Sequence, residues 1–135
     1  MSYARQIRVE FNHCDPAGIV FYPRYFEMTN SVCENFFREE VGHSYHAMME
    51  NRTGVPTVRL EVDFRAPSRL GDVIDWLMVI ERVGSSSATL RLEARGDGAL
   101  RLTVRKTIVW MTSDMRAGRW PDAVRSALTA HLEAP

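Results

Sequence analysis

One stretch decides how the rest of the chain can fold: His13-Cys14-Asp15-Pro16-Ala17-Gly18-Ile19-Val20-Phe21-Tyr22-Pro23-Arg24-Tyr25-Phe26. In it an acidic residue, a Pro/Gly turn and an apolar run lead into Pro23. Proline is tolerated at the first helical position because the N–H that it lacks would have no intrahelical acceptor there, so we expect a helix to begin at Tyr22 or Pro23. Its unpaired N–H groups should face Asp15 and Gly18 and favour negative charge.

The residues after Pro23 repeat with helical spacing. Apolar residues recur on one face at Tyr25, Met28, Val32 and Phe36, and polar residues on the other at Arg24, Glu27, Ser31, Glu34 and Arg38. Spacings of three and four residues predict a long amphipathic helix. Gly42, just beyond Val41, is the predicted stop.

This first stretch carries a family resemblance. Residues 15–26 resemble the active-site segment of hotdog-fold acyl-CoA thioesterases, specifically the 4-hydroxybenzoyl-CoA thioesterase family. Residues 62–73 are similar to the strand, proline and Gly-Asp turn in the middle of these domains. The resemblance spans about the whole chain, more weakly after Val83. It implies the hotdog fold, an α+β arrangement in which a five-stranded antiparallel sheet wraps around one long helix.

The strand pattern agrees with that expectation. Alternating or β-branched segments run from Tyr3 to Phe11, Val58 to Phe64, Asp72 to Val83, Ala88 to Arg95 and Leu100 to Trp110. Trp120-Pro121-Asp122 predicts a short closing helix. Between the long helix and the second strand, residues 42–54 predict an irregular connection or a short helix. We therefore expect one α+β domain over residues 1–135.

Lys106 interrupts the apolar parity of the last strand, which it shares with Val104 and Ile108. An unpaired ammonium is expensive to bury, so the sequence predicts either a β-bulge or a wet position on the sheet face.

Composition excludes several classes of function. Lys plus Arg and Asp plus Glu both number 17, so the overall charge does not predict binding to nucleic acid or to an anionic membrane. No apolar run is long enough to span a membrane and no leader pattern is visible, which predicts a soluble, cytoplasmic protein. Cys14 and Cys33 form no CxxC or CxxH pattern and are interpreted as free thiols.

No cofactor is expected. His43 and His46 have an HxxH spacing, but no third ligand is visible, so no metal site is predicted. The glycines form neither a GxGxxG nor a Walker pattern, which argues against nucleotide hydrolysis and dinucleotide redox chemistry.

The resemblance implies roles for three residues of the first stretch. Asp15 matches the family's catalytic carboxylate, as nucleophile or general base. The backbone N–H of Tyr22 matches the group that polarises the thioester carbonyl, and Gly18 would allow close backbone approach. A purely structural reading of Asp15 is that it caps a turn or a helix, as Asp before Pro and Gly often does.

Substrate-binding roles are expected for His13, Phe21, Arg65, Arg82 and Ser86. His13 could orient the acyl group or shift the pKa of the Asp15 carboxylate, and could equally be an exposed turn histidine. The two arginines and the turn at Ser86 are candidates for the phosphates of coenzyme A. The family's hydroxybenzoyl member differs from this chain at Asn12-His13, has Trp in place of Phe21, and carries a basic cluster in place of residues 84–87, so that substrate is not predicted.

The sequence thus predicts a thioester hydrolase, an acyl-CoA thioesterase that releases a small or medium acid, aromatic acids included, and coenzyme A. Two alternatives stay open. A hydroxyacyl-thioester dehydratase on the same fold would need His13 or His46 in the pocket, and a non-catalytic acyl-thioester binding module would leave the carboxylate idle. An open sheet edge predicts a homo-oligomer, for which the resemblance implies a dimer or a dimer of dimers with active sites at the interface.

Overall fold

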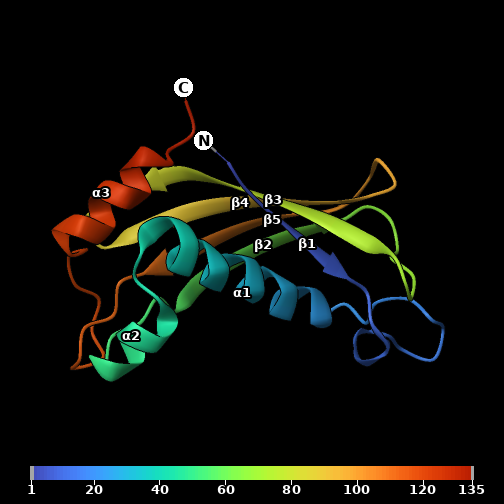
Figure 1. Ribbon diagram of the computed structural model, residues 1–135, viewed down its shortest axis with the longest axis horizontal. Coiled ribbons are helices and arrows are strands. Elements are labelled where there is room, and N and C mark those ends of the chain that lie inside the picture. The colour runs from blue at the N-terminus through green and yellow to red at the C-terminus, as the bar shows by residue number, and fades with distance from the viewer. Residues whose placement is uncertain (1, 135) are drawn as a thin grey trace.

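The computed structural model describes residues 2–134. In it a curved sheet packs over one long helix (Figure 1). The elements are β1 (Tyr3–Arg8), α1 (Arg24–Phe36), α2 (Tyr45–Glu50), β2 (Thr57–Phe64), β3 (Val73–Val83), β4 (Ser87–Gly96), β5 (Ala99–Val109) and α3 (Asp122–Ala130). A 3₁₀ turn (Phe11–His13) precedes α1 and a π-helical turn (Phe37–Val41) follows it. The predicted order of strands and helices is confirmed, with α2 as the short helix of the connection.

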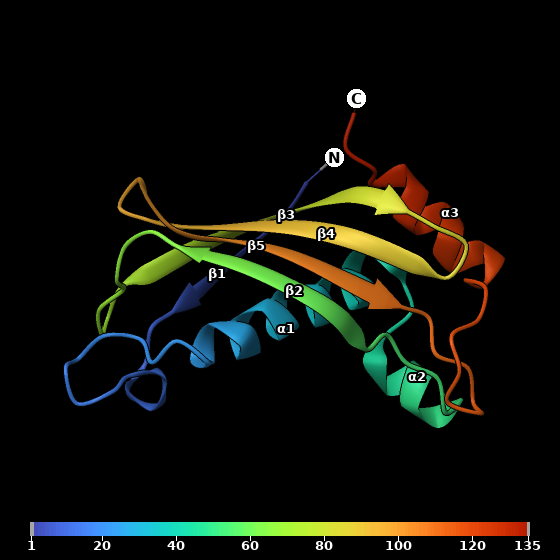
Figure 2. The ribbon, with the colours of Figure 1, turned by 180° about the vertical axis from the view of Figure 1, so that it is seen from behind.

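All five strands pair antiparallel in the order β1-β3-β4-β5-β2. β1 and β2 are therefore the two edges of the sheet. Figure 2 shows the loop before α1 at one end of the molecule, and α2 and α3 at the other. The molecule thus has two distinct ends, and α1 runs between them.

The core lies between α1 and the middle of the sheet. Tyr25, Met28, Val32 and Phe36, the predicted apolar face of α1, are all buried. They belong to one cluster with the side chains of β3, β4 and β5, including Trp76 and Leu92. Burying such a side chain contributes about 1.5–3 kcal/mol. The amphipathic helix is confirmed, and the left-handed conformation of Gly42, with φ of 75°, ends the π-helical turn after it.

Two predicted boundaries were wrong. α1 begins at Arg24 rather than at Tyr22 or Pro23, because the N–H groups of Arg24 and Tyr25 bond three residues back and close a turn instead of a helix. The first strand stops at Arg8, before Phe11. The 3₁₀ turn then carries Phe11 away from the sheet face, and the residue is 84% exposed.

The prediction for Lys106 was also wrong. It is neither in a bulge nor wet: it pairs in register with Leu60 and Leu90 and is only 3% exposed. Its side chain reaches from the sheet to α1, where Nζ donates a 2.8 Å hydrogen bond to Asn30 Oδ1.

β2 is the uncovered edge. Direct partners in an antiparallel pair lie on the same face, so Leu60 and Phe64, opposite Lys106 and Leu102, face the helix side of the sheet. They are nevertheless 38% and 50% exposed, because α1 does not extend over this edge. An exposed, apolar edge of this kind is a ready surface for pairing with another chain.

The turn into β3 is fixed by a buried cation. Arg101 is buried and donates to Pro67 O and Asp72 Oδ2, both at 2.9 Å, and to Gly96 O at 3.1 Å. Asp72 Oδ2 also accepts from the N–H of Arg69 at 2.9 Å. The Arg69 N–H first, and then Arg101, hold the pKa of the Asp72 carboxyl below its usual value.

We predict that Asp72→Asn lowers the stability at neutral pH by about 1–2 kcal/mol, because a charge-assisted bond is lost and Arg101 loses its counter-ion. A depressed carboxyl pKa stabilises the fold above the unfolded value near 4 and ceases to do so as the pH falls through the folded value. The difference in melting temperature between the parent and the Asp72→Asn variant should therefore become smaller below about pH 4.

Asp75→Asn is the matched control, since exposed Asp75 accepts only from the Gln6 side chain within residues 2–134. A variant at position 72 that melts like this control at neutral pH would contradict the proposed bracing of the turn.

Candidate active site

The loop that leads into α1 is held by its own backbone. The N–H of Asp15 donates to Ile19 O at 3.0 Å, and the N–H of Gly18 donates to Asp15 O at 2.9 Å. Phe21 closes the loop from the other side by donating to His13 O at 2.9 Å. Gly18 has φ of 78°, a left-handed conformation that the turn requires and that glycine adopts without strain. The Asp-Pro-Ala-Gly sequence therefore specifies a tight turn with a defined place for the side chain of Asp15.

The Asp15 carboxylate is half-buried in this turn. Its Oδ1 accepts a 2.9 Å hydrogen bond from the N–H of Ala17, the local bond that the structural interpretation predicts. Its Oδ2 has no hydrogen-bond partner, and no cationic side chain lies within 4.0 Å, among residues 2–134. One oxygen thus holds the turn and the other is open to a second molecule.

The N–H of Tyr22 is an unpaired donor at the end of the segment where α1 begins. On either side of it, the N–H groups of Phe21 and Arg24 have backbone acceptors, whereas that of Tyr22 finds none within the described part of the chain. It lies in the turn that opens α1, where the helix dipole favours negative charge. The structure therefore brings a half-free carboxylate and a free N–H donor into one loop, as the sequence predicts for Asp15 and Tyr22.

An apolar hollow of about 300 Å³ lies beside Tyr22. Its lining consists of Val20, Tyr22, Tyr25, Phe64, Arg65, Ala66 and Pro67. The ring of Tyr22 makes edge contacts with Phe64 and Phe26, with centroids 6.2 and 6.3 Å apart. Phe21 is exposed and lies against Tyr22, and Arg65 is an exposed cation at the rim. Of the predicted binding residues, Phe21 and Arg65 thus lie with Tyr22.

His13 adjoins this loop with a bond of its own. Its Nδ1 accepts a 2.8 Å hydrogen bond from the N–H of Glu10, which leaves the proton of a neutral ring on Nε2. The residue lines a different hollow, which lies between β1 and α1. The structure thus shows His13 as part of the 3₁₀ turn.

Arg82 and Ser86 lie at the far end of the molecule. Ser86 is in the β3–β4 turn, where its carbonyl accepts from the N–H of Trp110 at 2.8 Å. Arg82 lines a hollow on the outer face of the sheet with Arg59 and Thr107. Within one chain, the β3–β4 turn and the loop before α1 lie at opposite ends of the molecule (Figure 2).

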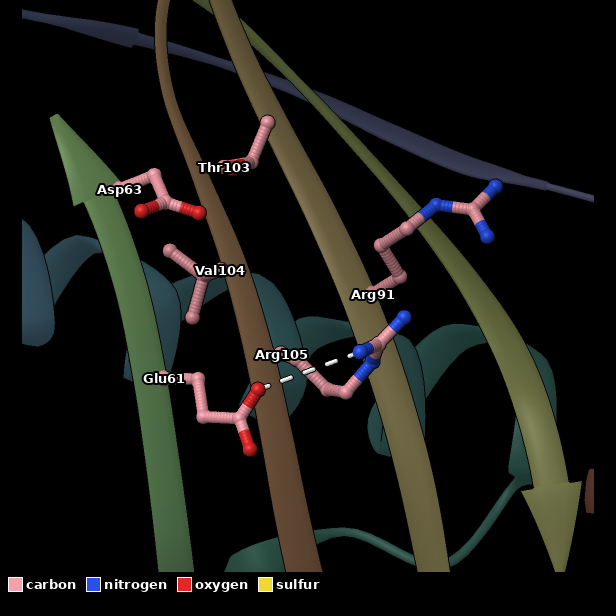
Figure 3. Close-up of a pocket in the computed structure, with 6 residues that line it drawn as sticks. All are labelled: Glu61, Asp63, Arg91, Thr103, Val104 and Arg105. Carbon is pink, nitrogen blue, oxygen red and sulfur yellow. Dashed lines mark ion pairs between the residues drawn. The ribbon is translucent and has the colours of Figure 1, made fainter. Parts of the chain in front are cut away.

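The outer face of the sheet carries charge rather than an apolar pocket. Figure 3 shows a hollow on this face, with α1 behind the sheet, lined by Glu61, Asp63, Arg91, Thr103, Val104 and Arg105. Arg105 lies 3.2 Å from Glu81 and 3.9 Å from Glu61, so its charge is already compensated. This ion-paired surface offers no apolar wall to an acyl chain.

The remaining candidates are dispersed. His43 packs against Trp110 with centroids 5.8 Å apart, while His46 is exposed on α2 beside Glu50. No group of three His, Cys, Asp or Glu side chains suited to a metal ion is found within residues 2–134. Cys14 and Cys33 are free thiols, as predicted. Among the described helices, none has the length and apolarity needed to cross a membrane.

A curved five-stranded antiparallel sheet with one long helix on its inner face, and a carboxylate and a free N–H ahead of that helix, define a hotdog-fold protein. Residues 9–128 match the model of the Thioesterase-like superfamily, and the chain belongs to this family. The predicted hotdog fold and family resemblance are thereby confirmed.

Solved structures agree over nearly the whole chain. A gentisyl-coenzyme A thioesterase superposes with a TM-score of 0.86 at 26% identity, covering 93% of this chain and 98% of that one. A mutant 4-hydroxybenzoyl CoA thioesterase complexed with 4-hydroxybenzoyl CoA gives 0.85 at 25%, covering 94% and 98%. A curated relative, the 4-hydroxybenzoyl-CoA thioesterase of Pseudomonas sp. (strain CBS-3), is 31% identical over 75 residues. That match spans 54% of this chain and about half, 53%, of the relative.

We predict that Gly18→Ala lowers stability by about 1–2 kcal/mol, the cost of a left-handed conformation for a residue with a Cβ. A Cβ at this position would meet no atom within 4 Å, so the loss should come from the backbone conformation alone. Gly18→Asn should retain more stability, because Asn tolerates positive φ. Urea unfolding of the two variants tests this, and equal losses for Ala and Asn would contradict it.

Proposed function

We propose that the chain is an acyl-CoA thioesterase that hydrolyses small or medium acyl groups, aromatic ones included, with Asp15 as its catalytic carboxylate. The observation that carries the proposal is the pairing, in one short loop, of a carboxylate with a free oxygen and a free N–H donor at Tyr22. Membership of the Thioesterase-like superfamily supports it, as do the thioesterases among the structural neighbours.

In the proposed reaction the thioester carbonyl oxygen accepts a hydrogen bond from the N–H of Tyr22, which stabilises the charge that develops on that oxygen. Asp15 then acts in one of two ways. It attacks the carbonyl carbon and expels the coenzyme A thiolate, leaving an acyl anhydride that water hydrolyses, or it takes a proton from a water that attacks directly. Both routes give the free acid and coenzyme A, and neither calls on a metal or a redox cofactor.

The hollow beside Tyr22 is the proposed place for the acyl end nearest the thioester. Its aromatic lining from α1 and β2 suits an apolar or aromatic group, and the structural neighbours include enzymes named for aromatic acyl-CoA substrates. Gly18 would let the substrate approach the backbone, and Phe21 would border its path. At the rim Arg65 would supply a cation for the phosphates of coenzyme A.

Arg82 and Ser86 can join this site only across a subunit interface. Two β2 edges that pair antiparallel about a two-fold axis place the far end of one chain beside the near end of the other. That arrangement would complete each site with residues of the partner chain. We therefore propose a homodimer, or a dimer of such dimers, with active sites at the interface.

The alternatives have less support. A dehydratase would need His13 or His46 in the pocket, yet His13 bonds to the turn and His46 lies on α2 at the other end. A non-catalytic binding module would explain the fold but would give no role to the free oxygen of Asp15 and the free N–H of Tyr22 in the same loop. We also propose that the enzyme acts in the cytoplasm, where its two free thiols would stay reduced.

We predict that Asp15→Asn lowers kcat on acyl-CoA esters by on the order of a hundredfold or more, because an amide neither attacks the thioester nor accepts a proton from water. Asn keeps an oxygen for the N–H of Ala17, so the turn and the melting temperature should be preserved. The measurement is kcat beside a thermal melt of the same sample. A variant that melts normally and turns over within a few-fold of the parent would remove Asp15 from the mechanism.

We predict a particle of at least twice the 15.5 kDa chain mass in light scattering at micromolar concentration. Val58→Asp, which places a charge on the 61% exposed side chain of the β2 edge, should shift the protein toward monomer. Glu93→Ala on the interior strand β4 is the control and should leave the mass unchanged. A parent that scatters only as a monomer would exclude the interface site.

A further inference from the structure

The chain places its one lysine inside the fold. Sixteen arginines and Lys106 make up its 17 basic residues. Lys106 lies in the second half of β5 on the face toward α1, and only 3% of the residue is exposed. An ammonium is a compact, strongly hydrated point charge that is costly to bury without a partner of opposite charge. The position therefore needs an explanation other than surface charge.

The ammonium has a neutral partner and no counter-ion. Nζ carries three donors, and its one hydrogen bond within residues 2–134 goes to Asn30 Oδ1, at 2.8 Å. No carboxylate oxygen of the described residues lies within 4.0 Å of it. Burial lowers the pKa of Lys106, and the titratable neighbour that acts on it is the buried thiol of Cys33, whose own pKa is raised by burial. An arriving anion would thus find donors that the chain leaves unused.

Lys106 adjoins an exposed seam that starts at the candidate active site. We use the name α1–β2 seam for the surface between α1 and β2. It is formed by Tyr22, Phe26 and Asn30, before and along α1, and by Leu60 and Phe64 on the facing side of β2. Tyr22 contacts both Phe26 and Phe64 at its near end. Leu60 pairs with Lys106 farther along, and both Leu60 and Asn30 are exposed beside the ammonium.

Two independent estimates place Lys106 along this seam. From Tyr22 to Asn30 is about 12–13 Å: the six residues from Arg24 to Asn30 rise about 9 Å as an α-helix, and the two before them add about 4 Å as a turn with bonds three residues back. From Phe64 to Leu60 is four residues, about 13 Å at the rise of a strand. A ligand oxygen bonded to Nζ would therefore lie roughly 9–10 Å from the thioester position, allowing about 3 Å for the hydrogen bond.

We propose that Lys106 is a specificity-determining residue that binds a carboxylate at the far end of the acyl chain, so that the preferred substrates are ω-carboxyacyl-CoA esters. The carboxylate accepts from Nζ in place of the Asn30 carboxamide, which turns outward to solvent from its exposed position. An extended chain advances about 3.3–3.6 Å for every three bonds, so a distance of 9–10 Å from the thioester carbon to the carboxylate oxygen corresponds to roughly eight or nine carbons. This inference rests on the proposed thioesterase function and names its substrate class.

The test compares kcat/KM for pairs of CoA esters of equal length, one ending in a carboxylate and one in a methyl group, from six to twelve carbons. We expect the carboxylate member to be favoured by about tenfold to a hundredfold at about eight or nine carbons, the range of a hydrogen bond to a charged group. Lys106→Met should bring this ratio to about one. Arg105→Met, which removes a cation from the outer face of the same strand, should leave the ratio as in the parent.

A second variant keeps the test valid if Lys106→Met does not fold. Asn30→Asp changes only an exposed side chain and gives the ammonium a permanent counter-ion, so it should abolish the preference while Lys106 stays in place. A parent without the preference, or a preference that survives both variants, overturns the inference.

Failure of the proposed function is distinguished by binding. With ¹⁵N-labelled lysine the protein should show one lysine side-chain signal, because Lys106 is the only lysine in the sequence. The esters are bound to the Asp15→Asn variant, in which hydrolysis is expected to be slow. Binding of the ω-carboxy ester should shift the Lys106 signal and raise its titration midpoint, and binding of the methyl-terminated ester should do neither. If no ester is hydrolysed by the parent but this difference is seen, the thioesterase proposal fails and the carboxylate site stands. Equal responses to both esters overturn the site.

Discussion

The structure depends on a single helix covering the inner face of a five-stranded sheet. α1 buries the middle strands with residues such as Met28, Val32 and Phe36, and within residues 2–134 no second helix extends that cover to Leu60 and Phe64 of β2. Apolar side chains of the edge strand, Leu60 and Phe64 among them, therefore stay partly exposed beside the helix. The same shortage of cover that leaves an edge open for a partner chain also leaves a seam in which an apolar chain could lie. The proposed homodimer and the proposed carboxylate site at Lys106 both depend on this geometric constraint.

Sequence patterns predicted the parts of the fold that local spacing decides. The apolar period of α1 and the alternation of β4 are each set by which face must be buried, and both were read correctly. The fate of Phe11 and the first residue of α1 depend instead on turn hydrogen bonds, which no periodicity records. Lys106 was misread for a different reason: its acceptor, Asn30, lies 76 positions away, and only the packed helix and sheet bring the two together.

The candidate site likewise has residues that a local motif predicts and residues that only the fold brings together. Asp15, Gly18 and Tyr22 fall within eight consecutive residues, so a short motif could indicate their chemistry and the loop could hold them together. The aromatic lining of the hollow beside Tyr22 depends on Phe64, which the pairing of β2 with β5 brings to Tyr22. The sequence pattern predicted Phe64 only as a strand residue. Of the two arginines chosen for charge alone, Arg65 lies at the rim of the hollow, whereas Arg82 lies at the opposite end of the molecule. Local sequence thus carries the reacting groups, whereas topology decides what surrounds them.

The two interpretations of Asp15, as a turn cap and as a reacting group, are compatible because a carboxylate has two oxygens. The bond from Ala17 to Oδ1 fixes the side chain within the turn, so that Oδ2 is held in place without being occupied. A reacting group that is already oriented loses little conformational freedom when substrate binds, and effective positioning accounts for a large part of many rate enhancements. In the proposed mechanism the structural bond is therefore part of the catalytic arrangement. The turn formed by Pro16, Ala17 and Gly18 supplies the rigidity, and the free oxygen supplies the chemistry.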